Sequence, residues 1–109
     1  MSLELIPTPE FIRSAKRLHK KYRLLYKDLE LLRSELTQDQ KLGTDLGAGC
    51  FKMRLPNSSI PTGKSGGFRV IYLFRNGEMI YLLDIYTNTE LESISEERLL
   101  DILKTNGLT

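Results

Sequence analysis

The sequence of 109 residues contains no tryptophan, one cysteine and one histidine. Cys50 alone cannot form an internal disulfide, and no cluster of cysteine and histidine is present to hold a structural metal. His19 lies in a basic segment, away from any serine or acid that would complete a nucleophilic site. The usual nucleophilic machinery is therefore absent, and we expect no metal and no cofactor.

Long apolar runs are also missing. No stretch approaches the ~20 apolar residues of a membrane-spanning helix, and the first residues lack the basic-then-apolar order of a signal peptide. We therefore expect a cytoplasmic protein with no membrane partner. The length suits one domain over residues 1–109, and the hydrophobic share of 40% is enough for one core.

Charge is unevenly distributed, although the formal net charge is only +2. Residues 11–27 carry seven basic side chains and no acid, whereas residues 84–109 are mainly acidic. The basic helix expected over residues 13–27 suits an RNA backbone. A solvated helix face explains the same pattern, and the sequence leaves both interpretations open.

Two helices are expected near the start, after a short strand over residues 2–6. Thr8, Pro9 and Glu10 form a typical helix start. The apolar stripe that follows has helical spacing: Phe11, Ala15, Leu18, Tyr22, Leu25, Leu29, Leu32 and Leu36. One helix of this length, near 40 Å, is too long for so small a domain, so we predict a helical hairpin with a break near residues 20–24.

Three strands and a final helix are predicted after a polar connector at residues 37–49. The strands are residues 50–55, 68–74 and 78–86; a mobile surface loop spans 56–67, and Arg75-Asn76-Gly77 makes a hairpin turn. Ser95 caps the last helix, which ends at Asn106-Gly107. The fold class is therefore α+β, with a helical hairpin on an antiparallel sheet and a C-terminal helix.

Four cations are expected to converge on this sheet. Lys52 and Arg54 project from the same strand face because they are two residues apart. Arg69 begins the next strand and Lys64 lies in the loop between them, so antiparallel pairing of the two strands brings all four to one end. Such a cluster can clamp a phosphate and stabilise charge developing at phosphorus. A solvated basic strand edge that discourages aggregation is the equally weighted alternative.

Residues 62–67 are not a phosphate-binding P-loop, although Gly63-Lys64-Ser65 matches the end of that motif. Ser58 stands where the motif needs its first glycine, and a strand follows where a helix should begin. Cys50, which has no histidine partner nearby in sequence, is expected to be a small strand residue.

Four segments together resemble the RelE/ParE superfamily of bacterial toxins, particularly its HigB-like branch. They cover most of the chain after residue 20: KYRLLYKDLELL (21–32), KLGTDLGAGCFKMRL (41–55), GKSGGFRVIYLF (63–74) and EMIYLLDIYTNTELESIS (78–95). The resemblance implies a helical hairpin packed on a curved antiparallel sheet. It also implies a toxin neutralised by a cognate antitoxin encoded beside it, of the helix-turn-helix type.

Active relatives cleave mRNA on the ribosome by attack of a ribose 2′-hydroxyl on the adjacent phosphate. The resemblance maps the family's basic strand positions onto Lys52 and Arg54, its arginine after Gly-Gly onto Arg69, and its loop lysine onto Lys64. Lys52, Arg54 and Arg69 are the catalytic candidates. The RNA-binding candidates are Lys64, Lys16, Lys20 and Arg23.

Two positions depart from the family pattern. The loop 58–62 carries no charge where relatives have a second lysine, and Asn88 stands where they have a lysine after the last long strand. Loss of a key cation from such a site lowers the rate by about 10²–10³ on general precedent. The hypothesis of an mRNA endonuclease therefore stands beside two others: a ParE-like toxin that binds gyrase without nuclease activity, and a weakened toxin that retains antitoxin binding.

Overall fold

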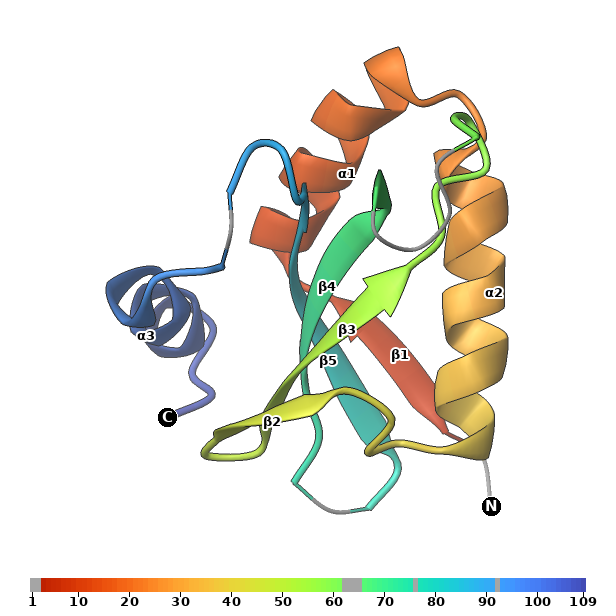
Figure 1. The fold of residues 1–109 in the computed structure, drawn as a ribbon. Coiled ribbons are helices and arrows are strands. Elements are labelled where there is room, and N and C mark those ends of the chain that lie inside the picture. The colour runs from red at the N-terminus through yellow and green to blue at the C-terminus, as the bar shows by residue number, and fades with distance from the viewer. Residues whose placement is uncertain (1–2, 62–65, 76, 92) are drawn as a thin grey trace.

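The chain forms three helices and a five-stranded sheet in a computed structural model that describes residues 3–61, 66–75, 77–91 and 93–109 (Figure 1). The elements are β1 (Glu4–Pro7), α1 (Pro9–Lys21), α2 (Leu25–Gln38), β2 (Thr44–Gly47), β3 (Cys50–Leu55), β4 (Phe68–Leu73), β5 (Met79–Thr87) and α3 (Glu96–Thr105). The strand order is β1-β5-β4-β3-β2. This is the α+β architecture predicted from the sequence.

The sheet is mostly antiparallel, and β1 is the exception. It runs parallel to β5, with Glu4 opposite Met79 and Pro7 opposite Leu82. Both helices of the hairpin intervene before the next strand, so no tight turn forces β1 to reverse. Thr8 then fastens the end of β1, because its Oγ1 donates to the carbonyl of Leu82 at 3.0 Å.

The helical hairpin breaks where it was predicted to break. Thr8 caps α1 by accepting the N–H of Phe11 at 3.2 Å, and α1 ends at Lys21. Leu24 precedes α2 and supplies no side-chain cap; its N–H donates to Ser59 Oγ at 3.0 Å. A side chain from a distant loop therefore stabilises a break that contains no glycine or proline.

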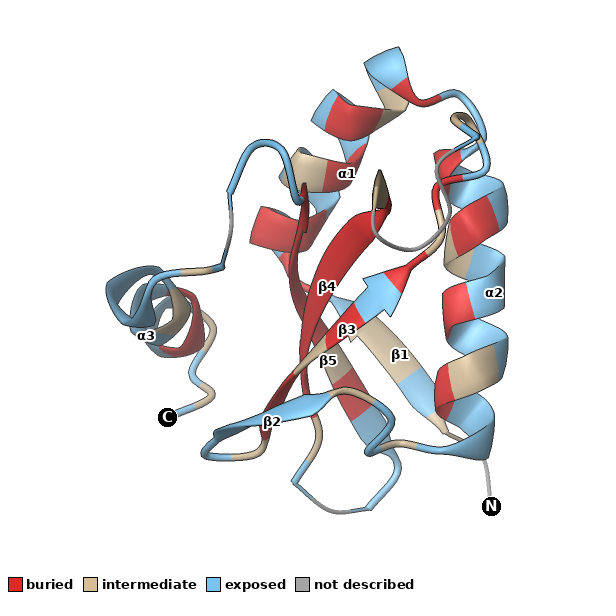
Figure 2. Cartoon of the chain, viewed as in Figure 1, coloured by how far each residue is buried: buried red, intermediate tan, exposed pale blue. Residues whose placement is uncertain are grey.

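One face of the sheet packs against α1 and α2. The predicted apolar stripe faces it, with seven of its side chains buried and Leu29 partly buried. Figure 2 shows these buried positions along the sides of α1 and α2 that face the strands. The sheet contributes alternate residues: Phe51, Met53, Leu55, Phe68, Val70, Tyr72, Ile80, Leu82 and Ile85. Together with the apolar side chains of α1 and α2, these strand residues form the main hydrophobic core.

The opposite face is covered in part by α3, which lies on the other side of the sheet from α2 (Figure 1). Ser95 caps α3 by accepting the N–H of Arg98 at 3.0 Å, as predicted. Ile102 and Leu103 bury the apolar side of the helix against Ile71 and Leu83. A second, smaller core results, and the part of this face beyond α3 is left to polar side chains.

The connector predicted over residues 37–49 is wrong in part, because α2 continues to Gln38 and β2 occupies Thr44–Gly47. β2 pairs with β3, with Thr44 opposite Lys52. Gly43 permits this approach, since a Cβ there would lie 2.6 Å from the backbone oxygen of Lys52. All four residues of β2 are exposed, so they show no apolar alternation that would reveal a strand.

The first half of the predicted mobile surface loop is fastened to α2. Asn57 is buried, and Asp28 accepts hydrogen bonds from the N–H and the hydroxyl of Ser58. That expectation is therefore wrong for residues 57–59, because a buried carboxylate on α2 satisfies the turn. The remainder of the loop at 62–65 lies outside the described residues.

β4 and β5 form the predicted antiparallel pair, in which Arg69 lies opposite Tyr86 and Ile71 opposite Asp84. A register shift follows Ile71, which places Leu83 and Asp84 together on the α3 side. Gly77 at the connecting turn has φ +78°, as a hairpin turn requires, while Asn76 lies outside the described residues.

Candidate functional site

Three predicted site residues lie together on the sheet face that carries α3. Arg54 on β3 is directly opposite Arg69 on β4, and Lys52 is two residues from Arg54 on the same face. The antiparallel pairing on which the prediction depended is therefore confirmed. We call Lys52, Arg54 and Arg69 the cation row; its catalytic role stays a prediction.

Arg69 is the buried member of the row, with only 6% of its surface exposed. Burial, followed by the nearby positive charge of Arg54, lowers the pKa of its guanidinium. Its Nη1 lies 3.4 Å from the carbonyl oxygen of Phe68 and 3.5 Å from that of Gly67. Like charges directly opposite one another in a sheet repel, and two facing guanidinium groups are well suited to bind one anion between them.

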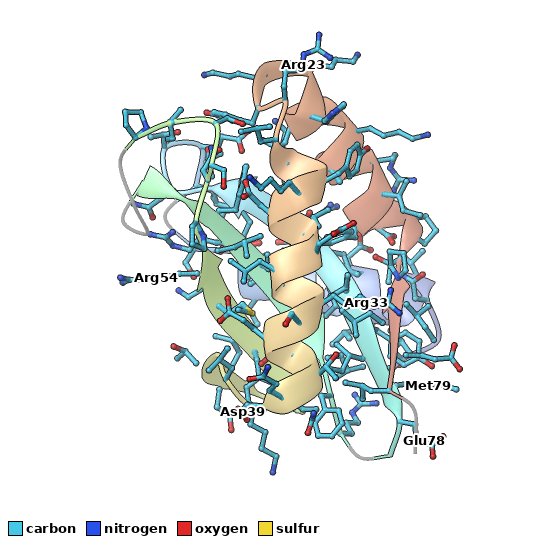
Figure 3. The ribbon with its side chains drawn as sticks, turned by 90° about the vertical axis from the view of Figure 1, so that its right-hand side faces the viewer. Arg23, Arg33, Asp39, Arg54, Glu78 and Met79 are labelled. Atoms are coloured by element: carbon cyan, nitrogen blue, oxygen red, sulfur yellow. The ribbon has the colours of Figure 1, made fainter. Side chains whose placement is uncertain are left out.

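Arg54 and Lys52 are the accessible members. Arg54 is exposed, and Figure 3 shows it directed away from the body of the molecule beside β3. Both side chains border an open hollow of about 350 Å³ on the side of β3 where its pairing with β2 ends, together with Glu35 and Gly43. An extended phosphate backbone could approach the row along this side.

Tyr86 extends the row onto β5, where sequence reasoning did not place a site residue. It lies opposite Arg69, is 4% exposed, and its hydroxyl accepts the N–H of Ile94 at 3.0 Å. Burial raises the pKa of Tyr86, more than the hydrogen bonds from Ile94 and Ser93 lower it. Two-residue alternation along β5 and its pairing with β4 are the signals that could have identified it.

Lys52 makes a contact with the segment that follows β5. Its Nζ lies 3.5 Å from Ser93 Oγ, a long hydrogen bond between residues 41 positions apart. Ser93 was not predicted as a site residue, because no local pattern links it to β3. The segment between β5 and α3 therefore reaches the accessible end of the cation row.

The RNA-binding candidates lie on other elements. Lys16 and Lys20 are exposed on α1, and Arg23 is exposed at the α1–α2 junction, at the top of the view in Figure 3. Lys64 lies outside the described residues. His19 on α1 packs against Tyr26 with the two rings tilted and their centroids 4.4 Å apart, so its predicted solvated position is only partly correct.

Cys50 behaves as the predicted small strand residue. It is fully buried in the core under α3, and burial raises the pKa of its thiol. A thiol that resists ionisation is a poor nucleophile at neutral pH. Across residues 3–61, 66–75, 77–91 and 93–109, no group of three His, Cys, Asp or Glu side chains could hold a metal ion.

A cavity of about 840 Å³ lies away from the cation row. It opens between β1, α1 and α2, and its walls are mainly apolar, including Phe11, Ile12 and Tyr26. Arg33 and Glu30 are its charged residues. The cavity lacks the converging cations of the β3–β4 face, so it is no candidate for chemistry at phosphorus.

No described helix has both the length and the apolar character needed to cross a bilayer.

No family model matches the sequence, and no curated protein is similar to it. The fold, however, is similar to that of a solved structure of the E. coli toxin RelE, a mutant in the free state. The TM-score is 0.62 at 14% identity, and the match covers 96% of this chain and 98% of the RelE chain. The chain therefore has the RelE fold, as the sequence resemblance implied.

Proposed function

We propose that this protein is a toxin of the RelE/ParE superfamily that cleaves mRNA on the ribosome. The observation that carries the proposal is the cation row: Arg54 directly opposite Arg69, with Lys52 next to them on the same sheet face. The RelE fold supports it. One fold hosts many functions, so the chemistry of these three side chains decides between them.

The reaction is transfer at phosphorus. The ribose 2′-oxygen attacks the adjacent phosphate and loses its proton, while the bond to the 5′-oxygen of the next nucleotide breaks and that oxygen gains a proton. The products are a 2′,3′-cyclic phosphate and a 5′-hydroxyl. Negative charge develops on the non-bridging oxygens during the transfer, and fixed cations stabilise it more than they stabilise the substrate.

The three cations divide this work. Lys52 and Arg54, which are accessible, bind and polarise the scissile phosphate, and the lysine ammonium can also donate a proton. Arg69, held by the strand pair, stabilises the transition state. Lys64 holds the flanking backbone, and Lys16, Lys20 and Arg23 bind RNA outside the site.

A cognate antitoxin, of the helix-turn-helix type, is the proposed protein partner, and the proposed site of action is the cytoplasm.

Asn88, exposed in the turn after β5 where relatives have a lysine, favours a second candidate: a toxin whose catalysis is weakened while antitoxin binding persists. Tight antitoxin binding without toxicity is the expected signature of that candidate.

Expression without antitoxin tests the proposal, with wild type compared with Lys52→Ala and Arg69→Ala. We expect wild type to stop growth and cleave mRNA, and each variant to cleave about 10²–10³-fold more slowly, because one charge that stabilises the transition state is lost. Arg33→Ala, which removes an exposed cation from α2, is the matched control and should cleave like wild type.

The catalytic assignment would be refuted if growth and mRNA integrity were equally normal in wild type, Lys52→Ala and Arg69→Ala. A DNA-damage response in place of translation arrest would favour the gyrase-binding alternative.

A further inference from the structure

The segment between β5 and α3 is fixed at both ends, and it contacts the cation row between them. At one end, Glu90 Oε2 forms an ion pair with Arg17 Nη1 of α1 at 2.5 Å. At the other end, the N–H of Ile94 donates to Tyr86 at 3.0 Å. Ser93, whose Oγ is 3.5 Å from Lys52 Nζ, stands next to the second tie. The second tie fixes the backbone beside this hydroxyl, and the first fastens the same segment three residues earlier.

Glu90 does more than pair with Arg17. Its Oε1 accepts the N–H of Thr87 at 2.9 Å and the hydroxyl of Thr87 at 3.1 Å, which closes the turn that ends β5. Burial alone would raise the pKa of this carboxyl, but the hydrogen bond from the Thr87 N–H and the neighbouring Arg17 lower it overall. One carboxylate thus joins the turn after β5 to α1. An exposed ion pair without such a turn would contribute little to stability.

Arg17 belongs to a polar flank of α1 that faces the C-terminal part of the chain. Glu10, Ser14 and Arg17 fall at helical spacing on one side of the helix. Glu10 accepts a hydrogen bond from Asn106 at 2.9 Å, and Ser14 donates to Asp84 at 2.7 Å. The first contact holds the end of α3 and the second holds β5. Of these three residues, Arg17 is the one that contacts the segment that reaches Lys52.

We propose that Arg17 and Glu90 are positioning residues of the cation row: through the turn after β5, they hold Ser93 where it orients the ammonium group of Lys52. This inference rests on the proposed function of the row. It assigns Arg17, one of seven cations in a basic run, to an intramolecular contact instead of an RNA phosphate. Lys52 needs such a guide because its ammonium sits on a flexible four-carbon stem.

Two substitutions remove the tie while sparing its surroundings. Glu90→Gln keeps an oxygen to accept from Thr87 and loses only the charge, and Arg17→Met keeps the length of an unbranched side chain. We expect each to slow single-turnover cleavage of ribosome-bound mRNA by roughly 10-fold, since small displacements of a reacting group cost this much or more. RNA affinity should stay unchanged, and the double variant should be no slower than either single variant. Arg33→Met is the matched control.

The sign of the Glu90→Gln effect separates positioning from RNA contact. If Arg17 contacted RNA phosphate, Glu90→Gln would free its guanidinium, and RNA would bind more tightly at low salt. That result would overturn the proposal. In a Lys52→Ala background, Arg17→Met should have no further effect on the rate. A further loss there would mean that Arg17 supports the fold in general, which would also overturn it.

Amide hydrogen exchange supplies a measurement that needs no activity. Loss of either partner should reduce protection of the Ile94 N–H, and leave the N–H of Phe74 protected, because it donates to the Gly49 carbonyl at the far end of β4. Unchanged protection at Ile94 would refute the tie, whether or not RNA is cleaved. If wild type cleaves no mRNA while Ile94 responds as expected, the proposed function fails and the tie stands as a structural contact alone.

Discussion

The two faces of the sheet are built for different tasks, although the same strands make both. On β3, Phe51, Met53 and Leu55 point into the core under α1 and α2, while Lys52 and Arg54 alternate with them on the α3 side. The first face is sealed by two helices along its length, and the second is covered by one short helix. Two-residue alternation therefore lets one strand contribute to the core and carry candidate catalytic side chains.

Because α3 covers only part of the second face, charged side chains there remain accessible to a ligand. A charge sealed under two helices would lose its hydration and would need a partner. Lys52 and Arg54 keep part of their solvent, whereas Arg69, closer to the centre of the sheet, already shows a lowered pKa from burial. If the two faces divide the work in this way, substitutions on the sealed face should cost far more stability than substitutions in the cation row.

Removing a large side chain from the sealed face should cost the most stability. Phe68 is fully buried and meets Tyr22 edge to face, with ring centroids 5.6 Å apart. We expect Phe68→Ala to lower the free energy of unfolding by about 3–5 kcal/mol through lost burial and a new cavity. Urea denaturation followed by circular dichroism measures this.

The matched change on the other face is Lys52→Ala, which should alter stability by no more than about 0.5 kcal/mol. A loss as large as that of Phe68→Ala would mean that the cation row is itself part of what holds the sheet together.

Acid should loosen the α3 side before the sealed face. The hydrogen bond from Asn106, despite an opposing effect of burial, lowers the pKa of Glu10 from its ordinary value of 4.5. A lowered pKa in the folded state means stability that is present above about pH 4.5 and lost as pH falls further. Glu10→Ala should cost about 1 kcal/mol at pH 7, through the lost hydrogen bond, and less at pH 3.

Urea denaturation between pH 7 and pH 3 checks this prediction. Glu10→Gln is the control, because the amide keeps an acceptor for Asn106 but cannot titrate in this range. It should lose the part of the pH dependence that Glu10 supplies. A slope between pH 5 and pH 3 equal to that of wild type would contradict the assignment.

Reversing one charge in the cation row should have the smallest effect and the opposite sign. Arg54 lies opposite Arg69, so Arg54→Glu replaces repulsion with attraction and should stabilise the fold by about 0.5 kcal/mol at low salt. Arg54→Gln removes only the repulsion and should give a smaller gain. Both gains should shrink in 1 M salt, where the screening length is about 3 Å. A thermal melt that shows destabilisation by Arg54→Glu at low salt would contradict the like-charge account.

Local patterns were sufficient for the helices, for four of the five strands and for the adjacency of Arg54 and Arg69. Thr8 and Ser95 marked helix starts through their own hydroxyl groups, and alternation placed Lys52 with Arg54. These features depend on neighbours in sequence. They could therefore be predicted without knowledge of the rest of the chain.

Features that depend on distant partners could not be predicted in this way. The N–H of Leu24 is satisfied by Ser59 from another loop, and β2 exists only because β3 offers it an edge. The contacts of Lys52 with Ser93 and of Arg17 with Glu90 likewise join residues far apart in sequence. Each is a product of tertiary packing, for which a single sequence carries no periodic signal.

The pairing of β1 with β5 also has a consequence for synthesis of the chain. Glu4 is among the first residues made, yet its partner Met79 follows only after both helices and three strands. Tyr86, which lies opposite Arg69, and Glu90 appear later still, about 1–4 s after Arg69 at an elongation rate of ~5–20 residues per second. Until then β4 is paired with β3 alone and Ser93 does not exist, so a half-made chain holds the cation row without Tyr86 beside it and without its contact to Ser93. The proposed site therefore gains its full set of neighbours only when the chain is nearly complete.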